Sequence, residues 1–269
     1  MRLFYEDFGE GHPIVFTHPG LATHSFWQHQ TAVLANEYRT VTYDWRGVGR
    51  SDRPRSGYTL RALTDDLLAL LEKLELGRVT LVTHGVGTHP VLSAYLRRPD
   101  LVARLVMISG APRYGGADDG DGGLSDDFSK WWTKETDSSG RVCAQAYANL
   151  YDRYAFRRDQ GPAVAQWFLN MGLESPLYVI NAYLANMRGT DFRDQLHRIT
   201  CPVMIAQARH DRKQRYEGAV YLAKHLPNAK LVTFEHSSHM PHIEEMALFN
   251  EELRAFVKQS ETQQATIPV

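Results

Sequence analysis

The chain has 269 residues, of which 43% are hydrophobic and 23% are charged, and its formal net charge is -1 at pH 7. This length suits one large α/β domain with an inserted subdomain, and the balanced charge argues against nucleic acid or an acidic membrane surface as a partner. The N-terminus, Met-Arg-Leu-Phe-Tyr-Glu-Asp, has no apolar run. We therefore expect neither a signal peptide nor a membrane-spanning helix, and predict a cytoplasmic protein.

Short apolar runs alternate with amphipathic segments along the first hundred residues, which indicates strands that alternate with helices. The predicted elements, in chain order, are strand 14–16, helix 23–36, strand 38–43, helix 59–74, strand 79–82, helix 86–97 and strand 101–109. This order is typical of a mostly parallel sheet with helices on both faces. The fold class is therefore predicted as α/β.

The pattern changes after Pro112 and resumes near residue 201. Residues 113–127 are rich in Gly and Asp, which predicts a loop, and the following residues are helical and aromatic in character. The later elements are predicted as strand 201–206, helix 216–226, strand 230–234 and helix 243–258. We thus expect a core of residues 1–112 and 197–260, an inserted helical cap of residues 113–196, and a flexible tail of residues 261–269.

The stretch at residues 81–90 reads Leu-Val-Thr-His-Gly-Val-Gly-Thr-His-Pro, an apolar strand that enters a helix through a tight turn. Strand, sharp turn and helix form the frame of a nucleophile elbow, Gly-x-Ser-x-Gly, whose central residue attacks the substrate. Gly85 holds the central position in this chain, so the position that normally carries the nucleophile has no side chain.

Several motifs together resemble the α/β-hydrolase fold. They are His18-Pro19-Gly20, the loop Asp44-Trp45-Arg46-Gly47-Val48-Gly49-Arg50-Ser51, the turn at 83–87, Asp211 after a strand, and Ser238-His239-Met240-Pro241-His242. The resemblance implies an α/β-hydrolase core with an inserted cap, and it places position 85, Asp211 and His239 in the family order of nucleophile, acid and histidine. It also implies an oxyanion hole formed by the backbone N-H groups of Gly20 and Val86.

The missing serine leaves several functions open. Gly85 could mark a hydrolase that was inactivated from Ser to Gly, or an enzyme whose His239 and Asp211 act as a general base on water or on the substrate. Such an enzyme would take a small apolar or aromatic ester, lactone or ketone, or cleave a C-C bond. The alternatives are a non-catalytic small-molecule binding protein or receptor, and a cofactor-free lyase or oxygenase.

Four tryptophans are predicted to contact the substrate, which we expect to be an apolar or aromatic small molecule. They are Trp27, Trp131, Trp132 and Trp167. No other partner is expected, and the chain is predicted to be a monomer or a homodimer. Histidines are frequent near the N-terminus, at positions 12, 18, 24 and 29, but their spacing fits no ligand pattern. We therefore expect no metal and no cofactor.

Overall fold

The computed structural model describes residues 1–114, 123–135, 149–187 and 189–264, and its centre is a seven-stranded sheet with the order β1-β3-β2-β4-β5-β6-β7. The strands are β1 (Tyr5–Phe8), β2 (Pro13–Thr17), β3 (Arg39–Tyr43), β4 (Val79–His84), β5 (Val102–Ile108), β6 (Val203–Ala208) and β7 (Ala229–Phe234). Every neighbouring pair is parallel except β1 and β3. The predicted mostly parallel α/β sheet is confirmed.

Strand β1 is the one strand that the hydrophobic pattern does not predict. It lies at the edge of the sheet and pairs antiparallel with β3, with Tyr5 opposite Tyr43. Its residues are half-buried or exposed, and Asp7 forms an ion pair with Arg39 of β3. Charged residues are common on edge strands because they discourage pairing with another chain. The same charges interrupt the apolar run, so the hydrophobic pattern does not predict this strand.

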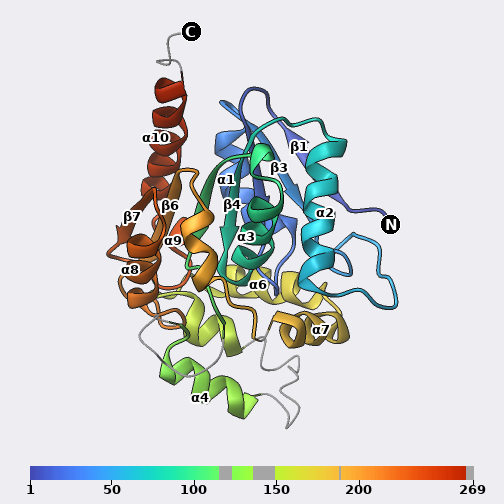
Figure 1. The fold of residues 1–269 in the computed structure, drawn as a ribbon. Coiled ribbons are helices and arrows are strands. Elements are labelled where there is room, and N and C mark those ends of the chain that lie inside the picture. Colours follow the sequence, from blue (N-terminus) through green and yellow to red (C-terminus); the bar gives the residue numbers. More distant parts are fainter. Residues whose placement is uncertain (115–122, 136–148, 188, 265–269) are drawn as a thin grey trace.

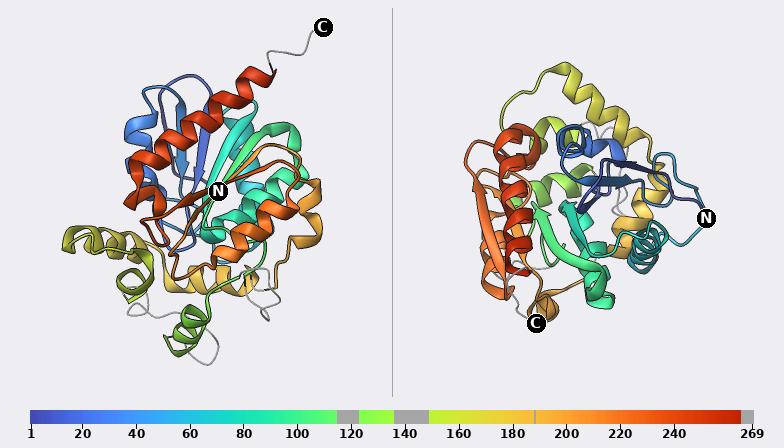
Figure 2. Two further views of the ribbon diagram at one scale, coloured as in Figure 1. Left: turned by 90° about the vertical axis from the view of Figure 1, so that its left-hand side faces the viewer. Right: turned by 90° about the horizontal axis from the view of Figure 1, so that it is seen from above.

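Helices cover both faces of the sheet, as Figures 1 and 2 show. Side chains alternate along the strands, so neighbours such as Leu81 and Val82 point to opposite faces and belong to separate apolar clusters. One face packs against α2 (Leu60–Lys73), α3 (Thr88–Arg97) and α8 (Tyr216–His225), and the other against α1 (Gln28–Leu34) and α10 (Met246–Gln264).

The helix boundaries differ from the prediction at two places. The helix expected over 23–36 is a 3-10 turn, η1 (His24–Trp27), followed by α1, and no side chain caps either one. At the other end of the chain, α9 (Pro241–Glu244) precedes α10, which extends to Gln264 and so includes the first residues of the expected flexible tail. Residues 265–269 lie outside the described part of the chain.

The segment between β5 and β6, which we call the inserted segment, carries several helices at the carboxyl end of the parallel strands (Figure 1). They are α4 (Asp126–Glu135), the π-helical turn η4 (Tyr151–Ala155), α6 (Pro162–Leu173) and α7 (Leu177–Met187). The 3-10 helix η5 (Arg193–Arg198) follows them and leads back along the sheet to β6. The predicted cap of 113–196 and its Gly/Asp-rich loop also contain residues 115–122, 136–148 and 188, which are outside the described ranges. None of the described helices is both long and apolar enough to cross a membrane.

Candidate active site

Gly85 lies at the turn where β4 passes through η2 (Gly85–Gly87) into α3. Its φ angle is +52°, in the left-handed region that costs an L-residue about 1–2 kcal/mol. A Cβ atom built on Gly85 would have His239 Nε2 at 3.8 Å and Pro19 Cβ at 3.9 Å as its nearest neighbours, which is ordinary van der Waals contact. Position 85 therefore has room for a side chain, and that side chain would face His239.

His239 and Asp211 are hydrogen-bonded, and both side chains are buried. His239 lies between β7 and α9, and its Nδ1 donates to Asp211 Oδ2 at 2.9 Å. Because a carboxylate only accepts hydrogen bonds, this contact places the proton of a neutral imidazole on Nδ1 and leaves a lone pair on Nε2. Nε2 has no hydrogen-bond partner within the described residues, so the lone pair is available toward the space beside Gly85.

Asp211 is held in place by three further donors. Its Oδ1 accepts from the backbone N-H groups of Lys213 and Gln214, both at 2.9 Å, and its Oδ2 accepts from Gln207 Nε2 at 3.0 Å. Burial raises the pKa of Asp211, but His239 and the backbone donors outweigh burial, and the pKa lies below its usual value. Asp211 is therefore an ionised acceptor that orients the imidazole.

The pKa of His239 lies below the ordinary value for histidine. Burial is the main cause, the Lys213 ammonium adds to it, and Asp211 acts in the opposite direction. A lowered pKa keeps the imidazole neutral near pH 7, the protonation state that a general base requires.

The backbone of His239 is anchored from the carboxyl ends of two strands. His84, the last residue of β4, donates from Nε2 to the carbonyl oxygen of His239 at 2.8 Å, and Ser109 Oγ donates to the same oxygen at 3.3 Å. The sequence assigns no role to either contact. His84 is neutral, because burial first and the neighbouring histidines second hold its pKa well below the usual value. The position of His239 therefore depends on β4 and β5.

The structure brings the two expected oxyanion donors together. Gly20 and Val86 line the same cavity, and a Cβ atom on Gly20 would lie 3.3 Å from Val86 Cγ1. Val86 is the second residue of η2, so its N-H is one of the first helical donors, which have no partner inside the helix. His18 fixes the loop before Gly20, because its Nδ1 donates to Pro19 O at 2.7 Å while its Nε2 accepts from the Trp45 N-H at 3.0 Å.

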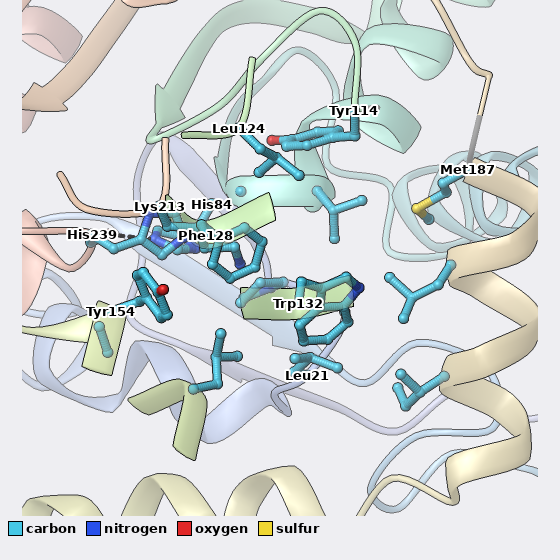
Figure 3. A pocket seen from close by; sticks show the side chains of 18 of the residues that line it. Leu21, His84, Tyr114, Leu124, Phe128, Trp132, Tyr154, Met187, Lys213 and His239 are labelled. Carbon is cyan, nitrogen blue, oxygen red and sulfur yellow. Dashed lines mark hydrogen bonds between the residues drawn. The ribbon is translucent and has the colours of Figure 1, made fainter. Parts of the chain in front are cut away.

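A cavity of about 360 Å³ opens beside Gly85 and His239, between the sheet and the inserted segment (Figure 3). Its walls are mainly apolar and aromatic, with Leu21, Phe128 and Trp132 among them. Tyr151 and Tyr154 also line it, but their hydroxyl groups donate to Leu21 O and Asp127, so they present mainly their rings. This size and lining suit a small apolar or aromatic ligand.

Of the four tryptophans predicted to contact the substrate, Trp132 lines this cavity and the other three do not. Trp27 is fully buried against Phe16 and Phe26, in the apolar cluster between the sheet and helices α1 and α10. Trp131 is on α4 beside Trp132 but packs into an aromatic cluster, and Trp167 packs against Phe168 and His29. Large aromatic side chains stabilise cores as well as ligand sites, and composition does not separate the two uses.

Lys213 is a cavity residue that the sequence analysis does not identify. It stands in the polar run Arg212-Lys213-Gln214, which is typical of an exposed loop. Its Nζ lies 5.3 Å from the centroid of the Phe128 ring. The only signal in the sequence is its place two residues after Asp211. Within the described part of the chain, no group of three or more His, Cys, Asp or Glu residues has the arrangement of a metal site.

Comparison with known proteins shows similarity along nearly the whole chain. A family model described as alpha/beta hydrolase fold matches residues 12–246. The non-heme chloroperoxidase of Streptomyces lividans is 31% identical over 96% of this chain and 96% of its own, and the karrikin insensitive 2 receptor IA of Petunia hybrida is 26% identical over 87% and 86%. The solved esterase from Exiguobacterium antarcticum has a TM-score of 0.84 and 25% identity over 95% of both chains.

Proposed function

Because the chain belongs to the α/β-hydrolase superfamily, we propose that it is an enzyme without a serine nucleophile, in which His239 is the general base and Asp211 orients it. The observation that carries this proposal is the His239 Nε2 atom, which is buried, without a partner among the described residues, and 3.8 Å from the place where a Cβ of residue 85 would stand. A base with a free lone pair beside an empty nucleophile position can act on a water molecule or on the substrate itself.

The proposed hydrolytic step uses water in place of a side chain. A water molecule beside Gly85 gives a proton to His239 Nε2 while its oxygen attacks the carbonyl carbon of an ester or lactone. The N-H groups of Gly20 and Val86 stabilise the negative charge on the carbonyl oxygen. His239 then returns the proton to the leaving alcohol oxygen, so that ester and water become acid and alcohol. With a ketone, His239 takes a proton from the carbon beside the carbonyl to give an enolate, whose oxygen the same two N-H groups stabilise, and then returns the proton to the enolate.

The substrate class follows from the cavity. The volume of about 360 Å³ holds a small molecule. Aromatic rings such as Phe128 and Trp132 on its wall favour an apolar or aromatic body. We therefore propose a small aromatic or apolar ester, lactone or ketone as the substrate, enclosed by the inserted segment.

A non-catalytic receptor is the second candidate, and one specific observation favours it. The relative from Petunia hybrida is named as a receptor, although the Streptomyces relative and the solved esterase are named as enzymes. A binding protein has no need for a neutral, unpartnered imidazole or for a carboxylate that accepts from Gln207, Lys213 and Gln214. Catalysis therefore accounts for more of the geometry.

The test is turnover of aryl esters, lactones and aryl ketones by the wild-type chain, His239→Ala and Asp211→Asn. We expect wild-type turnover without a burst of the first product, because no acyl-enzyme forms, and a loss of roughly 10²-fold or more in His239→Ala. A label found in the acid after reaction in ¹⁸O-labelled water would show cleavage at the acyl carbon, and the missing burst is the result that distinguishes direct attack by water from an acyl-enzyme. Ligand binding without turnover would replace this proposal with the receptor, and turnover that His239→Ala leaves unchanged would refute the role of His239 as the general base.

A further inference from the structure

Lys213 brings a positive charge into the cavity, next to the atoms assigned to catalysis. The backbone N-H of Lys213 donates to Asp211, which fixes the main chain at this point, and the side chain extends along the cavity wall. Figure 3 shows Lys213 beside His239 and Phe128. The ammonium group therefore lies close to the reacting end of the cavity.

The ammonium group has no anionic partner within the described residues. The ammonium group faces the Phe128 ring, with Nζ 5.3 Å from the ring centroid, and it forms no ion pair or side-chain hydrogen bond with a described residue. Among the described residues that line the cavity, Lys213 carries the only formal charge apart from the histidines. A cation surrounded by apolar groups is costly unless an anion pairs with it.

We propose that Lys213 binds a carboxylate of the substrate, so that the substrate is a small aromatic or apolar carboxylic acid whose reactive carbonyl lies between the carboxylate and the aromatic wall. The position of the carbonyl rests on the proposed function of His239, whereas recognition of the carboxylate does not. An ammonium group supplies three donors and no acceptor, which suits a carboxylate and disfavours a carboxamide of the same shape.

The neighbouring charges support this assignment. Among the described residues, Asp211 is the only carboxylate that raises the pKa of Lys213, and its oxygens already accept hydrogen bonds from His239, Gln207 and two backbone N-H groups. Burial is the larger influence and lowers the pKa of Lys213 to about 8, so the amine is still mainly protonated at pH 7. Within the described part of the chain, this positive charge is therefore offset only by Asp211, which makes no direct ion pair with it.

Binding of carboxylates and of their neutral counterparts tests the proposal without any need for turnover. The probes are phenylacetate and 3-phenylpropionate with the corresponding primary amides, and the dissociation constant of each is measured by calorimetry at pH 7. A charge-assisted contact corresponds to a preference of about ten- to a hundredfold for the carboxylate. We expect this preference in the wild-type chain and in Lys213→Arg.

Two further variants complete the test. Lys213→Met keeps a long apolar stem without the charge, and should bind carboxylate and amide alike. Lys130→Met makes the same change at an exposed position of α4 and should keep the preference. Thermal melting establishes that each variant is folded, and Lys213→Gln replaces Lys213→Met if the latter is not.

Equal binding of the carboxylate and the amide to the wild-type chain would overturn the proposal. Persistence of the preference in folded Lys213→Met would do the same. If the preference depends on Lys213 while no substrate is turned over, the proposed catalytic function fails and carboxylate recognition stands. The two ideas are therefore separable.

Discussion

Replacing Gly85 with serine should turn the site into one that reacts covalently. The new Cβ would be 3.8 Å from His239 Nε2, and the hydroxyl oxygen is one covalent bond further on. Rotation about the Cα-Cβ bond can then place that oxygen within about 2.6–3.2 Å of Nε2, the reach needed between a nucleophile and its base. A fluorophosphonate probe should label Gly85→Ser and leave the wild-type chain unlabelled at this position.

The stability of the variant follows from the backbone of Gly85. Because the nearest contacts of the new Cβ are 3.8 and 3.9 Å, no neighbour has to move. The cost is the positive φ angle of +52°, about 1–2 kcal/mol for an L-residue, which corresponds to a fall in Tm of about 2–8 °C. Gly85→Ala carries the same strain without a hydroxyl group, so its Tm should match that of the serine variant.

Labelling, melting temperature and ester turnover are measured on the wild-type chain and both variants. Turnover of aryl esters should rise by roughly 10²-fold or more in Gly85→Ser alone, a part of the ~10⁶-fold that a serine supplies in an optimised triad. A folded Gly85→Ser that neither labels nor gains turnover would show that Gly85 does not stand at a nucleophile position. A fall in Tm much larger than 8 °C in both variants would show that the positive φ angle of residue 85 is not the main source of the destabilisation.

Further predictions concern the titrating groups. The kcat/KM of the wild-type chain should rise with pH around a midpoint below 6.5, since burial lowers the pKa of His239 and only the neutral imidazole accepts a proton. Lys213→Met removes a positive charge near His239, so the midpoint should move to higher pH in that variant. Asp211→Asn should lower kcat by roughly 10²-fold, and by no more than His239→Ala does, because the wrong imidazole tautomer is favoured; an unchanged kcat would contradict the orienting role. Burial lowers the pKa of His18 and His89 to about 4 in the folded chain, so on acidification the unfolded chain takes up these two protons before the folded chain does. The free energy of unfolding should therefore be highest above pH 6.5 and should be lower at pH 5 by about 2 kcal/mol for each histidine. A Tm that is equal at pH 7 and pH 5 would contradict neutral buried histidines.

The sheet was predictable because its strands are short runs of buried apolar residues, such as Val79 to Val82, separated by amphipathic helices. Such runs predict strands from the local sequence alone. Strand β1 is not predicted in this way, because Glu6 and Asp7 interrupt its apolar residues and its pairing with β3 depends on a segment about 35 residues away. The expected helix 23–36 is divided at Trp27, whose backbone angles (φ -100°, ψ 6°) are not α-helical, and no local pattern specifies this break.

The candidate site was predictable where motif order alone places a residue. Asp211 and His239 come from such motifs, and the structure brings them into contact. Lys213 could not be found in this way, because its half-buried position beside Phe128 of the inserted segment is set by tertiary packing, and a lysine in a polar loop is normally solvated. The same distinction applies to Trp132, since only the three-dimensional arrangement separates it from Trp131.

The bond from His84 to the carbonyl of His239 spans 155 positions of the sequence. Contacts of such long range form late in folding, because a large loop must close before they can contribute. During synthesis β1 to β5 leave the ribosome well before β6, β7 and the loop that carries His239. A chain that has folded only its first five strands thus holds the Gly85 turn but no base beside it, and the site is completed only when the last third of the chain docks.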